Sequence, residues 1–236
     1  MFLDPYHSQK EGLILISADQ GSQFARQVAG DFNPIHNPDN KRFCVPGDLL
    51  FSLVLAKYGL SQRMSVRFSG MVGADTPLVF PEIDEGVIDI KDTSGKAYLH
   101  VEHSGETSHD PALIESLARN YVAFSGQNFP YIIVPLLEKH QVMFNPRRPL
   151  VIYESMAFEL DGIDLNEPTL ELANTSLEVN GKRGDALFEF VIKSDGRVAG
   201  KGTKKLIVSG LQPYDAELMQ VVIDDFNMVK AANQPS

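Results

Sequence analysis

The chain has 236 residues, of which 43% are hydrophobic and 22% charged, the balance of an ordinary globular protein of one large or two small domains. Its net charge of −10 argues against a nucleic-acid partner or an anionic membrane surface, because both need a concentrated basic surface. The one cysteine, Cys44, cannot form an intramolecular disulfide and indicates a reducing compartment. No secretion signal or membrane-length apolar run is recognised, so we expect a cytoplasmic protein.

The first half of the chain predicts two helices followed by strands. A short strand is expected at 12–17 and a helix at 18–30, which Gly30 ends. Residues 47–59 are apolar on almost every side and predict a buried helix. Four strands are expected after it, the last two joined by a tight turn, at 64–72, 76–83, 86–92 and 96–103.

The second half repeats this plan after a polar stretch at 103–111, which predicts a linker. A helix is expected at 111–126, an apolar helical run at 129–141, and an amphipathic helix at 215–231. Between the last two, four strands are expected at 150–160, 169–179, 185–194 and 197–208. The pattern therefore predicts an α+β protein in which antiparallel strands curl round an apolar helix.

An internal repeat supports the two halves. Residues 28–36 and 124–132 lie at matching positions within the two halves. When they are aligned, they share a glycine and a proline. The second copy has glutamine and isoleucine where the first has Asp31 and His36. The sequence therefore predicts one site for the pair of halves, with the second copy kept for its turn geometry.

Candidate chemistry concentrates in the stretch AGDFNPIHNPD of the first copy. A carboxylate such as Asp31 and an imidazole such as His36 can work as general base and general acid. Pro34 restricts the backbone between them, and the amide of Asn33 can orient a carboxylate or a water molecule. Gly47, at the start of the buried helix, offers a backbone N–H to an oxyanion. The same residue types form Asx and proline turns, so the spacing alone also permits a plain turn.

The motif has a family resemblance. Residues 30–36 read Gly-Asp-x-Asn-Pro-hydrophobic-His after Phe24, and they resemble the hydratase motif of the MaoC-like family of (R)-specific enoyl-CoA hydratases and dehydratases. Residues 66–78, VRFSGMVGADTPL, resemble that family's first strand after the helix. The resemblance covers mainly residues 20–105, and the second half matches only in layout.

The resemblance implies a double hot-dog, with two antiparallel sheets each wrapped round a buried helix. The halves would span 1–105 and 111–210, followed by a C-terminal helix and tail at 211–236. It also implies hydration of trans-2-enoyl thioesters, or the reverse dehydration of 3-hydroxyacyl thioesters, without metal or cofactor beyond the substrate's own CoA or acyl carrier. Asp31 and His36 would activate the water and Asn33 would orient the site. The residues expected to bind substrate are Gly47, Pro34, Lys41 and Arg42, the last two through a CoA phosphate.

Alternatives remain open. The second copy lacks the ionisable pair, and Pro46 stands where the family has histidine, which would suit a non-catalytic acyl-CoA or acyl-carrier binding protein. A thioesterase would need an acid at a helix, for which Asp48 and Glu138 are candidates.

The basic turn at 145–149 is a second candidate site for binding a CoA phosphate. Three histidines within 100–110 permit a metal site, but their split between strand and loop argues against it. The expected protein is a monomer of two paired halves or a homodimer.

Overall fold

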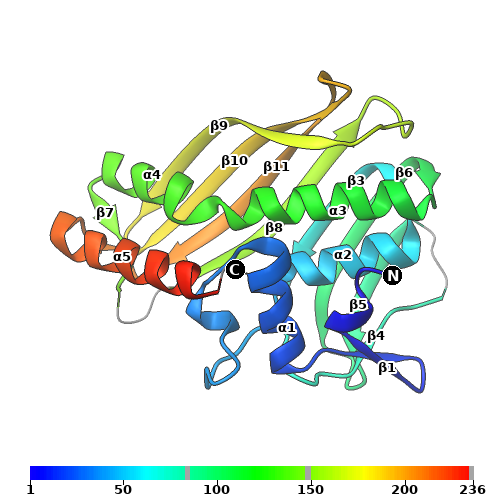
Figure 1. The fold of residues 1–236 in the computed structure, drawn as a ribbon, viewed down its shortest axis with the longest axis horizontal. Helices are drawn as coiled ribbons and strands as arrows, with labels where there is room; N and C mark the ends of the chain where they lie inside the picture. Colours follow the sequence, from blue (N-terminus) through cyan, green and yellow to red (C-terminus); the bar gives the residue numbers. More distant parts are fainter. Residues whose placement is uncertain (83–85, 147–149, 234–236) are drawn as a thin grey trace.

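The computed structural model describes residues 1–82, 86–146 and 150–233 (Figure 1). A large antiparallel sheet forms one layer, and the helices lie together over one of its faces (Figure 1). The strands of this sheet, in spatial order, are β1 (Ser8–Lys10), β2 (Leu13–Leu15), β4 (Leu78–Val79), β5 (Val87–Asp92), β6 (Ala97–Ser108), β3 (Leu60–Phe68), β8 (Val151–Leu160), β11 (Arg197–Ser209), β10 (Arg183–Ser194) and β9 (Thr169–Asn180). A separate two-stranded sheet pairs β7 (Val142–Met143) with β12 (Gln212–Pro213).

The two halves of the chain meet within this sheet. The resemblance implied two sheets, but the described residues form one continuous sheet of ten strands, because β3 pairs directly with β8. The register runs from Arg63 opposite Glu159 to Arg67 opposite Ser155. Outward from this junction the order is β3-β6-β5-β4 on one side and β8-β11-β10-β9 on the other. The strand order of the first half is therefore repeated in the second.

The helices follow the predicted plan. They are α1 (Ala18–Phe24), α2 (Gly47–Tyr58), α3 (Pro111–Gly126), α4 (Ile133–Lys139) and α5 (Ala216–Ala232), and none in the described chain is long and apolar enough to cross a bilayer. A π turn extends α1 through Ala25–Ala29, and another, Asn128–Ile132, precedes α4. Pro135 is the third residue of α4, which continues directly from this π turn.

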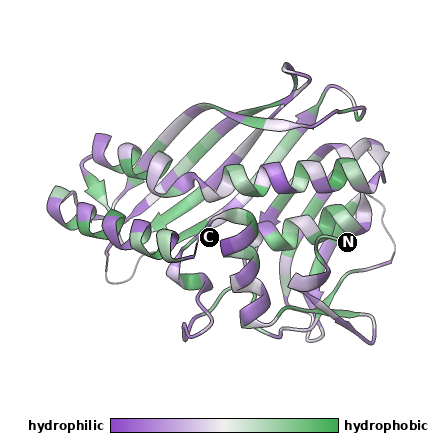
Figure 2. Ribbon diagram, viewed as in Figure 1, coloured by the Kyte–Doolittle hydropathy of each residue, from purple (hydrophilic) through white to green (hydrophobic). Residues whose placement is uncertain are grey.

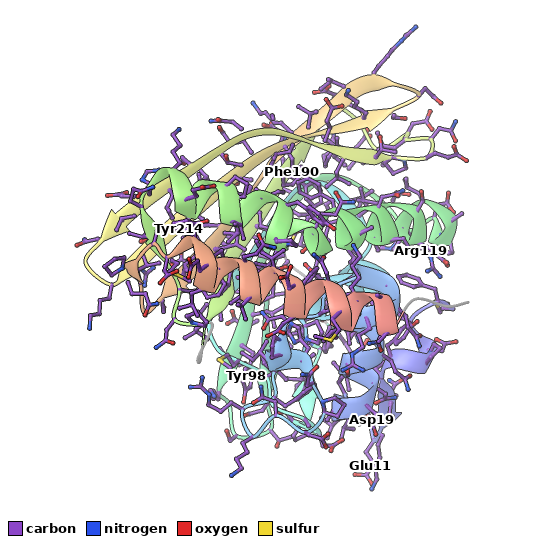
Figure 3. All side chains as sticks on the ribbon, turned by 60° about the vertical axis from the view of Figure 1, so that its left-hand side comes forward. Glu11, Asp19, Tyr98, Arg119, Phe190 and Tyr214 are labelled. Atoms are coloured by element: carbon purple, nitrogen blue, oxygen red, sulfur yellow. The ribbon has the colours of Figure 1, made fainter. Side chains whose placement is uncertain are left out.

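The core lies between the sheet and the helices. Most of α2 is buried, as its apolar sequence predicts, whereas α5 alternates between hydrophilic and hydrophobic residues (Figure 2). One apolar cluster surrounds α2 and α3, and a second surrounds α4 and the inner face of α5. Phe190 of β10, labelled in Figure 3, joins the sheet to α3 through ring contacts with Tyr121 and Phe124, at centroid distances of 6.2 and 5.4 Å.

The expected linker at 103–111 is mostly strand, so that prediction was wrong. Strand β6 continues to Ser108, with a bulge at which Gly105 takes a φ of +87°. The side chain of Gln62 on β3 accepts the N–H of Glu106 at 3.0 Å and holds the bulge. The polar residues mark an irregular part of the strand rather than its end. Asp110 then caps α3 by accepting the N–H of Ala112 at 3.0 Å.

Candidate active site

The stretch around Asp31 is a tight turn at the end of a helix. Gly30 has a φ of +64° and ends the π turn that follows α1. The Oδ1 atom of Asp31 accepts the N–H of Asn33 at 2.9 Å, and Oδ1 of Asn33 accepts the N–H of Ile35 at 3.2 Å. The expected Asx turn is therefore present. The side-chain oxygen of Asn33 caps the short helix Pro34–His36 rather than orienting the neighbouring carboxylate.

The same turn brings the carboxylate and the imidazole together. Oδ2 of Asp31, the oxygen that the turn does not use, lies 3.6 Å from Nε2 of His36. Nδ1 of His36 lies 2.7 Å from the carbonyl oxygen of Cys44. Because a carbonyl oxygen only accepts, Nδ1 carries the hydrogen, and Nε2 is the ring nitrogen that faces Asp31. A distance of 3.6 Å is too long for a direct hydrogen bond and suits one oxygen atom that contacts both groups.

Both groups open into a cavity of about 410 Å³ between the two halves. The motif turn and the start of α2 contribute one side, and the end of α3, the start of α4 and β8 contribute another. Helix α5 covers part of it through Val222, Asp225, Phe226 and Val229. Most of the wall is apolar, as in a pocket for a largely hydrocarbon ligand. Aliphatic and aromatic wall residues include Leu50, Phe68, Val72, Phe129, Phe144 and Leu206.

The predicted site residues divide in two. Five of them lie in the cavity wall: Asp31, Asn33, Pro34, His36 and Gly47. Lys41 and Arg42 are exposed on the following turn and do not line the cavity. In the basic turn at 145–149, Pro146 reaches the wall, but Arg147 and Arg148 lie outside the described residues. Among the described residues, no group of three or more His, Cys, Asp and Glu is arranged to hold a metal ion.

Gly47 brings helix backbone to the cavity wall. A Cβ atom built on Gly47 would lie 3.1 Å from Cε1 of Phe68 and 3.3 Å from Cδ2 of Tyr153. The two rings therefore press against the first residue of α2, and a side chain there would have to move them. The first N–H groups of a helix have no acceptor within it and carry partial positive charge. This backbone is suited to receive a carbonyl or an oxyanion.

A polar cluster, which we define as Asp48, Ser125, Tyr153 and Lys204, adjoins the cavity, and all of its members except the half-buried Tyr153 are buried. Oγ of Ser125 donates to Oδ2 of Asp48 at 2.5 Å and lies 2.8 Å from the hydroxyl of Tyr153. Nζ of Lys204 lies 3.4 Å from Oδ1 of Asp48, donates to Ser125, and stands 3.5 Å from the ring centre of Tyr153. Ser125 and Tyr153 also line the cavity. The cluster joins α2, α3, β8 and β11.

The sequence reading missed this cluster. Lys204 is 1% exposed, because β11 lies in the interior of the sheet and its alternate residues face the helices. Burial raises the pKa of the Asp48 carboxyl, against the opposing effects of Lys204 and Ser125. Burial lowers the pKa of the Lys204 ammonium, against the opposing charge of Asp48. The alternation of Gly202, Lys204 and Leu206 in β11 could have placed this lysine on the inner face from the sequence.

Cys44 and the two acids considered for a thioesterase lie in different surroundings. Burial raises the pKa of the Cys44 thiol to about 11, so the thiol stays protonated near neutral pH. Of the acids considered for a thioesterase, Asp48 is buried beside the cavity, whereas Glu138 is exposed on α4.

Comparison with known proteins identifies a family but no activity. A family model described as protein of unknown function (DUF3581) matches residues 1–217, and the chain belongs to this family. No curated protein matches the sequence significantly.

Several solved structures are similar in outline. An acyl-CoA thioesterase II from Mycobacterium marinum is 12% identical, with 91% of this chain and 100% of that chain covered and a TM-score of 0.41. A hot-dog-fold protein of unknown function from Alicyclobacillus acidocaldarius is 10% identical, with coverages of 91% and 99% and a TM-score of 0.44. A MaoC-like dehydratase is 9% identical, with coverages of 85% and 97% and a TM-score of 0.42. Likeness at this level does not identify an activity, so any function has to be argued from the residues of the site.

Proposed function

We propose that this member of the DUF3581 family adds water to the double bond of a trans-2-enoyl thioester, or catalyses the reverse dehydration of a 3-hydroxyacyl thioester. The observation that carries the proposal is the 3.6 Å separation of Oδ2 of Asp31 and Nε2 of His36 in the wall of a mostly apolar cavity. In this proposal residues 1–105 supply the catalytic pair. Residues 111–210 and the helix after them complete the acyl pocket.

The pair would hold the reacting water. With its hydrogen on Nδ1, neutral His36 presents Nε2 as an acceptor beside the carboxylate of Asp31. A water molecule that donates to both directs a lone pair at carbon 3 of the enoyl chain. The C–O bond forms there as one water proton passes to the pair, and the pair returns one proton to carbon 2. The sum is the addition of one water molecule, with no oxidant or reductant.

The start of α2 would bind the thioester carbonyl. As water adds, the electrons of the double bond move towards the carbonyl oxygen, which becomes negatively charged. The N–H of Gly47 and the positive end of α2 are suited to stabilise that charge. Lys41 and Arg42 are exposed away from the cavity wall, so any contact they make with a CoA phosphate would be made outside it.

The test is the loss of enoyl absorbance when the protein meets a short and a medium trans-2-enoyl-CoA. Asp31→Asn and His36→Gln should each lower kcat by at least about a hundredfold, the scale of a lost general acid or base. Asp39→Asn is the matched control, because Asp39 is exposed in the same loop and does not line the cavity. Absence of turnover with both chain lengths from folded protein would refute the hydratase proposal, and ligand binding without turnover would favour a binding protein.

A specific observation also supports a second candidate, thioester hydrolysis. Ser125 lines the cavity, and Asp48 accepts its hydroxyl hydrogen. Attack of Oγ on the thioester carbon would pass the serine proton to Asp48, which would give it to the departing thiolate as the C–S bond breaks. Water would then attack the serine ester, leaving its OH on the acyl carbon and returning a proton to Oγ. Release of free thiol from saturated acyl-CoA that Ser125→Ala abolishes and Asp31→Asn leaves intact would favour hydrolysis over hydration.

A further inference from the structure

Arg26 is a half-buried cation whose contacts are amides rather than carboxylates. It lies on the π turn Ala25–Ala29, which leads into the motif turn. Nη2 of Arg26 donates to Oδ1 of Asn37 at 2.9 Å, and Nη1 lies 3.5 Å from Oδ1 of Asn233, just beyond α5. Within the part of the chain that the structure describes, no acidic side chain forms an ion pair with this guanidinium. Its place is therefore explained by the two amides and not by charge pairing.

The amide of Asn37 stands at the end of the segment that carries both proposed catalytic groups. Asn37 directly follows His36, and its backbone N–H closes the short helix that carries this histidine. At the other end of the segment, the N–H of Asp31 donates to the carbonyl oxygen of Ala25 at 2.8 Å. Two consecutive residues, Ala25 and Arg26, therefore hold the first and the last residue of the segment.

Holding both ends of this segment fixes the spacing inside it. Nε2 of His36 lies 3.6 Å from Oδ2 of Asp31, a gap that suits one oxygen atom in contact with both. Nδ1 of the same ring lies 2.7 Å from the carbonyl oxygen of Cys44. If the end of the segment moved, the ring would have to give up one of these two distances. Such distances matter, since a misplacement of about 1 Å can cost roughly a hundredfold in rate.

The second amide on Arg26 lies outside the catalytic segment. A distance of 3.5 Å is beyond the usual range of an N–H···O hydrogen bond, so the contact with Asn233 is the weaker one. Nδ2 of Asn233 donates to the carbonyl oxygen of Val229 at 2.8 Å, within the last turn of α5. Figure 1 shows this end of α5 beside the helical segment that carries Arg26. The two amides thus offer a matched pair of variants on one guanidinium.

We propose that Arg26 is a positioning residue for Asp31 and His36, and that it acts by holding Asn37. The inference rests on the proposed function in that these two side chains carry out the reaction. Arg26 does not line the cavity, so it acts through the segment and not through the substrate. Its loss should therefore lower kcat and leave KM nearly unchanged.

Variants of the guanidinium and of its two amides test the proposal in the full chain. Asn37→Ala and Arg26→Met should each lower kcat for a medium-chain trans-2-enoyl-CoA about tenfold, with KM within about threefold of wild type. The double variant should lose no more than either single variant, because both changes remove the same hydrogen bond. Asn233→Ala is the matched control, since of the contacts of Arg26 it removes only the 3.5 Å one, and its kcat should stay within about twofold of wild type.

NMR of nitrogen-labelled histidine side chains gives a readout that needs no turnover. The wild-type ring of His36 should show a single tautomer with its hydrogen on Nδ1, because the carbonyl of Cys44 accepts it. In Asn37→Ala and Arg26→Met we expect a mixture of tautomers, with the spectrum otherwise that of folded protein. The signals of His36 are assigned by their loss in His36→Gln.

Several results would overturn the inference. These are an unchanged His36 ring in both variants, additive losses of kcat in the double variant, or a loss in Asn233→Ala equal to that in Asn37→Ala. If Arg26→Met fails to fold, Asn37→Ala removes the same hydrogen bond and leaves the guanidinium in place. Absence of turnover in wild-type protein would refute the proposed function, whereas the NMR comparison would still decide whether Arg26 positions the ring.

Discussion

The ring of Phe226 stands edge-on to the ring of Phe32, with centroids 5.8 Å apart and planes 82° apart. This contact links α5 to the residue directly after Asp31. Phe226 also meets Phe129 at 5.1 Å, so one side chain of the last helix touches both copies of the motif. Nearly all of α5 lies beyond residue 217, where the family match ends, yet it contributes to the wall of the candidate site.

Phe226→Ala should weaken substrate binding more than chemistry. The change removes a buried ring from the cavity wall but touches neither Asp31 nor His36. We expect KM for a medium-chain enoyl-CoA to rise about tenfold, with kcat within about threefold of wild type. Met228→Ala is the control on the same helix, because Met228 is 64% exposed. A fall in kcat with unchanged KM would place Phe226 in the chemical step instead.

Gly47→Ala should disturb the position of the thioester carbonyl. The added methyl group would lie 3.1 Å from Phe68 and 3.3 Å from Tyr153, so the rings or the helix start must move. We expect kcat/KM to fall at least about tenfold, since small misplacements in a site are costly. Gly162→Ala is the matched control, because nothing lies within 4 Å of its added atom. Equal activity of the two variants would exclude the start of α2 from the site.

Lys204→Met should destabilise the fold strongly. It leaves the carboxyl of Asp48 buried without its cation, which typically costs about 3–5 kcal/mol of unfolding free energy. Adding Asp48→Leu should recover much of the loss, and denaturant unfolding measures both. Lys205→Met is the control, since the side chain of Lys205 is 40% exposed and its ion pairs are worth at most about 1 kcal/mol. Independent, additive losses in the double variant would show that Lys204 and Asp48 do not act as a pair.

Cys44 should resist alkylation at ordinary pH. Its folded-state pKa of about 11 lies above the usual 9.0, so the reactive thiolate is scarce until the pH approaches 11. The same shift favours the folded state below pH 9.0, and this contribution is lost as the pH rises through about 11. Iodoacetamide labelling followed by mass spectrometry should be slow at pH 8 for folded protein and fast in denaturant. Rapid labelling of the folded protein at pH 8 would contradict the raised pKa of this half-buried thiol.

Local sequence patterns predicted the local structure well. The apolar run 47–59 predicted the buried helix now seen as α2, and the alternating segments predicted an antiparallel, α+β architecture. The turn residues of the motif placed Asp31 and His36 in one short segment, where their distance depends on few dihedral angles. These features depend on neighbours within about ten residues, which a sequence displays directly.

Features that depend on distant contacts were not predicted. Ser125 and Lys204 are 79 positions apart, and only the packing of α3 against β11 brings them together. The pairing of β3 with β8, which merges the expected two sheets, likewise depends on both halves being folded.

The pairing of β3 with β8 has a consequence for the chain as a whole. A half separated from the other would expose the backbone edge of its innermost strand, and an open edge of that kind recruits other chains into aggregates. Neither half is therefore expected to persist alone, and their fusion in one polypeptide supplies the two in a fixed ratio of one to one. A pair of identical subunits has to keep the same residues on both sides, whereas two fused halves are free to diverge. One turn can then retain an acid and a histidine while its counterpart carries glutamine and isoleucine at the matching positions.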